Sequence, residues 1–100
     1  MSADRIKGLI MASFFIKIQN KKGLHARAAA LFVKEIERFQ SEVWVTFDGQ
    51  KVSGRSIMGL MMLAAGQGSA LEIDVNNDAE SPLIQEALTA LADDKFHEGE

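Results

Sequence analysis

Residues 43–54, VWVTFDGQKVSG, decide the fold. Every residue from 43 to 47 is β-branched or aromatic, and a second short run at 50–54 follows Asp48 and Gly49. An Asp-Gly pair between two such runs is a strong hairpin signal, because a two-residue turn of this kind needs a positive φ at both central positions. We therefore predict antiparallel strands at 43–47 and 50–54.

Two further strands are predicted on either side of this hairpin. Residues 14–19 and 71–75 alternate apolar and polar side chains, which is typical of strands with one buried face. The side chains expected on the solvent face of the sheet are Lys17, Gln19, Thr46, Glu72 and Asp74.

Helices are predicted in the longer connections. Residues 26–39 carry apolar side chains at spacings of three and four, with charged residues between them. Ser56 is placed to cap a short helix at 57–65, which Gly66 is expected to end.

The last helix is expected to start at Ser81 as its N-cap, with Pro82 in the first turn. Fraying is expected from residue 96 onward. The element order is then β-α-β-β-α-β-α. It favours an α+β, open-faced β-sandwich, in which three helices cover one face of a four-stranded antiparallel sheet.

Composition limits the function classes. The 100 residues fit one domain, and the absence of cysteine excludes disulfides and thiolate metal sites. A net charge of −3 argues against a nucleic-acid partner, and no apolar run is long enough to span a membrane. We expect a cytoplasmic monomer with an extension at 1–12, a domain at 13–96 and a flexible tail at 97–100.

One segment contains residues suited to a chemical reaction: Gly23-Leu24-His25-Ala26-Arg27. His25 directly precedes a predicted helix, whose unpaired N–H groups and macrodipole favour an anion. These groups should keep the imidazole neutral, so that it can attack phosphorus, and Arg27 adds a permanent cation. The alternative is an exposed histidine at a helix entry with an ordinary surface arginine beside it.

The short helix at 57–65 has more apolar side chains than it can bury. We expect Ile57, Leu60 and Leu63 or Ala64 to pack inward, leaving Met58 and Met61 or Met62 exposed as an adaptable docking patch. The scattered acidic residues show no metal-ligand spacing, so we expect no metal and no cofactor.

The segments 23–27 and 49–59 resemble the two signatures of the HPr family and of its nitrogen-branch relative NPr, and the resemblance extends over 14–91. It implies a phosphocarrier, not an enzyme. By this resemblance His25 accepts a phosphoryl group on Nδ1 from enzyme I, which phosphoenolpyruvate charges, and Arg27 steadies it. The group then passes to an enzyme IIA of the sugar or the nitrogen branch.

The resemblance also implies regulation at Ser56 by an HPr kinase/phosphorylase, and binding of enzyme I through Ile57, Met58 and Met61. One residue departs from the family pattern: Ala28 stands where the family usually has proline. The alternative function is a regulatory binding module of the same fold that acts without phosphotransfer.

Overall fold

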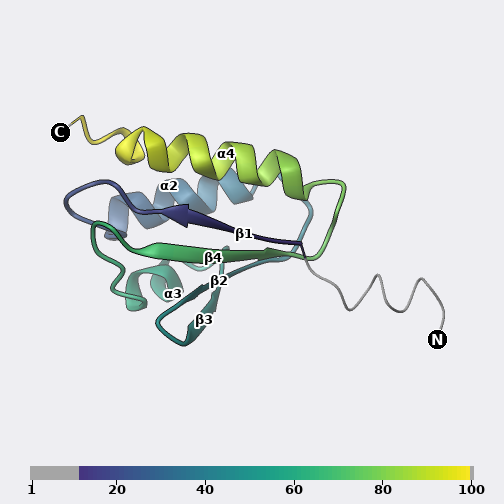
Figure 1. The fold of residues 1–100 in the computed structure, drawn as a ribbon, viewed down its shortest axis with the longest axis horizontal. Coiled ribbons are helices and arrows are strands. Elements are labelled where there is room, and N and C mark those ends of the chain that lie inside the picture. Colours follow the sequence, from purple (N-terminus) through teal and green to yellow (C-terminus); the bar gives the residue numbers. More distant parts are fainter. Residues whose placement is uncertain (1–11, 100) are drawn as a thin grey trace.

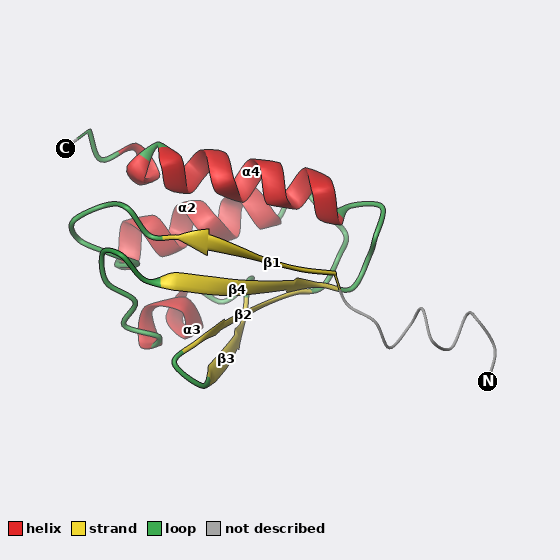
Figure 2. Ribbon diagram, viewed as in Figure 1, coloured by secondary structure: helices red, strands yellow, loops and turns green. Residues whose placement is uncertain are grey.

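The computed structural model describes residues 12–99 (Figure 1, Figure 2). Its elements are β1 (Ala12–Lys17), α2 (Ala26–Ile36), β2 (Val43–Phe47), β3 (Gln50–Ser53), α3 (Ile57–Met62), β4 (Ala70–Val75), α4 (Ser81–Asp93) and the 3₁₀ turn η1 (Lys95–His97). The strand β1 begins at Ala12, one residue inside the predicted extension, and residues 1–11 lie outside the described part of the chain.

The four strands form one antiparallel sheet in the order β1-β4-β2-β3. In β1, β2 and β4 the buried residues alternate with less buried ones, and facing pairs such as Val43 with Val75 and Val45 with Ile73 supply the sheet's half of the core. Helix α4 packs along β1 and α3 against β3, while α2 touches both helices. The predicted α+β open-faced sandwich is confirmed.

The predicted hairpin is confirmed at the residues that define it. Asp48 and Gly49 have φ values of 51° and 80°, and Phe47 pairs with Gln50 across the turn. The mirror-image turn matches the right-handed twist of the strands.

Two helices end earlier than predicted. Helix α2 stops at Ile36, and the bond from the Phe39 N–H to the Ile36 carbonyl continues the chain as a tighter turn. Helix α3 stops at Met62, and the left-handed residue after it is Ala64 (φ 53°), not Gly66. This turn buries Ala65 and brings its carbonyl to the loop before α2.

The start of α4 also differs from the prediction, because Ser81 lies inside the helix and caps nothing. The Asn77 side chain accepts from the Ala79 N–H (2.9 Å) in the turn that precedes the helix. The Glu80 carboxylate accepts from the Ser41 hydroxyl and from the Ser41 N–H (2.8 Å). The Ser41 hydroxyl bond is the main cause that holds the pKa of the Glu80 carboxyl below its usual value, against the effect of burial.

Candidate functional site

The loop before α2 depends on a glycine. Gly23 has a φ of +69°, and a Cβ there would lie 2.5 Å from the Ala65 carbonyl oxygen and 2.9 Å from the Gly66 Cα. The backbones approach this closely because the Leu24 N–H donates to that same Ala65 carbonyl (2.9 Å). The segment after α3 is thereby fixed against the loop that carries His25.

His25 is the N-cap residue of α2. Its backbone is extended (φ −82°, ψ −175°), its carbonyl accepts from the Ala29 N–H (2.8 Å), and its side chain makes no cap bond. The imidazole therefore takes no part in capping α2 and lies at the positive end of the helix dipole. Its side chain is 29% exposed.

The imidazole borders a depression of about 570 Å³ whose other lining residues include Lys21, Lys22 and Arg27. Arg27 is exposed in the first turn of α2 and has no hydrogen bond or ion pair with any residue of the described range 12–99. Helix N–H groups and three cationic side chains beside one imidazole form an arrangement that favours a bound anion. The structure thus brings His25 and Arg27 together as the sequence predicts.

A carboxylate that the sequence analysis missed completes this site. The Glu98 Oε2 atom lies against the His25 Nε2 atom, and the buried Asn20 Nδ2 donates to the Glu98 Oε1 (3.0 Å). The hydrogen bond from His25 is the main cause that holds the pKa of the Glu98 carboxyl below its usual value, against the effect of burial. The Asn20 bond and the nearby Lys22 charge act in the same direction.

Glu98 reaches the site because the chain end folds back, which corrects the expectation of a frayed tail. The Phe96 ring is fully buried, so the chain is anchored beyond the end of α4. Lys95, Phe96 and His97 all have positive φ values of 52°, 52° and 63°. The end of α4, the loop after β1 and α3 gather at the same end of the molecule (Figure 1).

The structure confirms the capping role of Ser56. Its Oγ accepts from the Gly59 N–H at 2.9 Å at the start of α3. Ala28, at the position where the family usually has proline, is fully buried in the core side of α2.

Helix α3 presents an apolar surface, which we call the α3 patch. Leu60 and Leu63 are buried as predicted, but Ile57 is 40% exposed and does not join the core. The reason is the length of the helix, because six residues turn only one narrow face to the sheet. The members of the α3 patch are Ile57 (40% exposed), Met58 (67%), Met61 (37%) and Met62 (69%).

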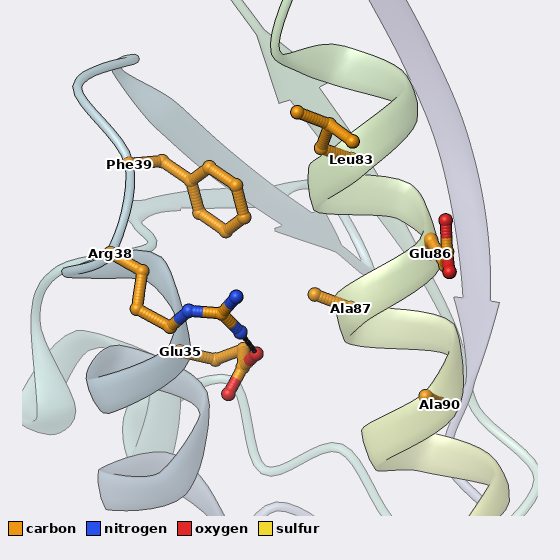
Figure 3. A pocket seen from close by; sticks show the side chains of 7 residues that line it. All are labelled: Glu35, Arg38, Phe39, Leu83, Glu86, Ala87 and Ala90. Carbon is orange, nitrogen blue, oxygen red and sulfur yellow. Dashed lines mark hydrogen bonds and ion pairs between the residues drawn. The ribbon is translucent and has the colours of Figure 1, made fainter.

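A second depression lies between α2 and α4, away from His25 (Figure 3). Phe39 and Arg38 face it from the end of α2, opposite Leu83 and Ala87 of α4. The Arg38 guanidinium pairs with Glu35, so this charge is already matched within the depression. No serine, threonine, histidine or lysine side chain lines it.

Within residues 12–99, no group of three or more His, Cys, Asp and Glu side chains could hold a metal ion. In the same range, no helix has the length and apolar character to cross a membrane. The other described histidine, His97, is exposed and pairs with Asp94 of the same turn.

The fold and the site together define a class, that of small open-faced sandwiches that hold a histidine at a helix N-terminus beside cationic side chains. Comparison with known proteins gives the family. Residues 12–94 match the family described as PTS HPr component phosphorylation site, where PTS is the phosphotransferase system. The chain belongs to this HPr family of phosphocarrier proteins.

Individual proteins similar to this chain support the same family assignment. The phosphocarrier protein HPr of Neisseria meningitidis is 48% identical over 85 residues, which are 85% of this chain and 94% of that protein. The HPr-like protein Crh of Halalkalibacterium halodurans is 47% identical over 76 residues, 76% of this chain and 86% of that protein. The crystal structure of HPr-C-His from Thermoanaerobacter tengcongensis superposes with a TM-score of 0.79 at 42% identity, covering 88% of this chain and 98% of that one.

Proposed function

We propose that His25 is the phosphoacceptor of this phosphocarrier. It takes a phosphoryl group from enzyme I, which phosphoenolpyruvate charges, and passes it to an enzyme IIA of the sugar or nitrogen branch. The protein acts as a cytoplasmic monomer that carries the group and turns over no substrate of its own. The observation that supports this proposal best is the His25 imidazole beside a depression lined by Lys21, Lys22 and Arg27.

The hydrogen bonds of the imidazole favour Nδ1 as the acceptor atom. Nε2 contacts the Glu98 carboxylate, whereas Nδ1 has no hydrogen-bond partner among residues 12–99. Nδ1 supplies the lone pair for the new N–P bond, and the bond from phosphorus to its donor atom on enzyme I breaks, leaving its electron pair on enzyme I. Arg27 would offset charge on the phosphoryl oxygens.

The test is incubation with enzyme I and labelled phosphoenolpyruvate, followed by acid treatment. Phosphohistidine is acid-labile and phosphoserine is not, so acid-labile label supports His25. Acid-stable label, or none, would reject it.

The second candidate is a regulatory binding module that acts through contacts alone. The exposed α3 patch favours it, because this surface would bind a partner with or without phosphotransfer. A protein that binds enzyme I but takes no label would support this second function over the first.

Ser56 is proposed as a regulatory phosphorylation site for an HPr kinase/phosphorylase, in addition to its capping role. Ser56→Asp keeps a capping oxygen and adds favourable charge at the helix N-terminus, so the free energy of unfolding should hold or rise slightly. Transfer to His25 should slow, because this charge must be desolvated when α3 docks. Ser56→Ala should lose about 1 kcal/mol of stability and keep near-normal transfer.

Denaturant unfolding and transfer rates at sub-saturating enzyme I measure the two effects. A Ser56→Asp variant that accepts phosphate as fast as the parent protein would reduce Ser56 to a helix cap.

The α3 patch is proposed as the docking surface for enzyme I, through Ile57, Met58 and Met61. Met58→Glu or Met61→Glu should weaken enzyme I binding by about 1 kcal/mol or more, because an unpaired charge is penalised in an interface. The fold should survive, since Met58 is 67% exposed.

Calorimetric titration with enzyme I measures this loss of affinity. Leu83→Glu is the matched control, because Leu83 is also an exposed apolar residue (56%) but lies on α4. If Leu83→Glu weakens binding and both methionine variants do not, the docking surface lies on α4.

A further inference from the structure

The Glu98 carboxylate is held by two donors that approach different oxygens. His25 Nε2 lies against Oε2, and Asn20 Nδ2 donates to Oε1. Asn20 is fully buried, and its amide also donates to the Gly23 carbonyl (2.8 Å). One buried amide therefore fixes both the loop that carries His25 and the carboxylate that faces it.

The backbone that brings Glu98 to this position is itself constrained. Three successive non-glycine residues, Lys95, Phe96 and His97, occupy the left-handed region, which side chains with a Cβ rarely adopt. Burial of the whole Phe96 ring offsets this strain. The buried Phe96 ring thus anchors the segment that carries Glu98.

The charges around the pair are unequal. The positive charge of Lys22 lowers the pKa of the Glu98 carboxyl. Lys21 and Arg27 line the same depression, and Glu98 is the one acidic residue among its lining residues. The carboxylate lies on the Nε2 side of the ring, and Nδ1 has no partner within residues 12–99. A carboxylate on one ring nitrogen keeps the proton there and makes the other nitrogen the nucleophile.

We propose that Glu98 is a positioning residue for phosphotransfer at His25, which holds the proton on Nε2 and neutralises the ring once it carries phosphate. This inference rests on the proposed function. When the N–P bond forms at Nδ1, the bond from phosphorus to enzyme I breaks with its electron pair left on enzyme I, and Nε2 keeps its proton. The ring gains a positive charge, and the Glu98 carboxylate is in place to pair with it.

The consequence is a shift in the transfer equilibrium. A carboxylate that pairs with the charged phosphorylated ring stabilises phosphorylated His25 relative to phosphorylated enzyme I. Glu98→Gln retains the shape and one acceptor oxygen but removes the charge. We expect it to lower the equilibrium constant for transfer from enzyme I to His25 about threefold, the range of a partly exposed ion pair.

The control is Asp94→Asn, which removes the same charge from the other carboxylate–histidine pair of this segment, Asp94 with His97. It should leave the equilibrium constant unchanged. If Glu98 only stabilised the fold, Glu98→Gln and Asp94→Asn would have the same effect on the equilibrium constant, since each variant neutralises one acidic residue in this segment.

Proton NMR of the unphosphorylated protein tests the contact directly. The His25 Nε2–H should give a resolved signal in the parent and in Asp94→Asn, and lose it to solvent exchange in Glu98→Ala. Equal equilibrium constants for Glu98→Gln and Asp94→Asn, or an unchanged signal in Glu98→Ala, would overturn the role of Glu98. A parent protein that takes no label would instead reject the proposed function itself.

Discussion

The His25→Ala variant should fold normally and accept no phosphoryl group from enzyme I. It should fold because the His25 side chain makes no cap bond to α2 and is 29% exposed, so helix α2 does not depend on it. Loss of the partly exposed pair with Glu98 should destabilise the fold only slightly, because exposed ion pairs contribute little to stability. It should not accept phosphate because no other imidazole lines the depression that Arg27 borders.

Label transferred from phosphoenolpyruvate through enzyme I measures this result, and denaturant unfolding checks the fold. The matched control is His97→Ala, since His97 is the other of the two histidines and is exposed on η1. His97→Ala should take up label as the parent does. Full labelling of His25→Ala, together with no labelling of His97→Ala, would show that His97 is the acceptor.

The sequence predicts the sheet well because its signals are local. Asp48 and Gly49 accept the positive φ of a hairpin turn, and alternation along 71–75 shows which side chains face the core. Helix ends are less accurate, since they depend on contacts that the sequence does not show. Ala64 ends α3 in a left-handed conformation because the Ala65 carbonyl must meet the Leu24 N–H, a tertiary constraint.

In the candidate site, too, the residues with a local sequence signal are predicted and the residue that depends on a tertiary contact is not. His25, Arg27 and Ser56 are found because each lies beside a helix start, where the chemistry follows from local backbone groups. Glu98 is 73 residues from His25, and no spacing rule links them. The one available signal is Phe96, an aromatic residue in a polar chain end that is expected to be frayed, which could have indicated an anchored turn.

Gly23→Ala should be the most disruptive change in the loop that carries His25. Gly23 has a φ of +69°, and an alanine there adds about 1–2 kcal/mol of backbone strain. Its Cβ would also lie 2.5 Å from the Ala65 carbonyl oxygen, a backbone atom that cannot rotate away. We expect the free energy of unfolding to fall by more than about 2 kcal/mol, because the contact adds to the strain. Transfer should also fall, since relief of the contact moves the residue two positions before His25.

Gly49→Ala separates the two causes of this loss. Gly49 has a similar φ of +80°, but a Cβ there meets no atom within 4 Å. Its loss of stability should therefore be the strain alone, about 1–2 kcal/mol, and transfer to His25 should stay normal. Denaturant unfolding of both variants and label transfer through enzyme I measure the difference. Equal losses of stability, with normal transfer in both variants, would mean that the segment after α3 moves freely and does not position the His25 loop.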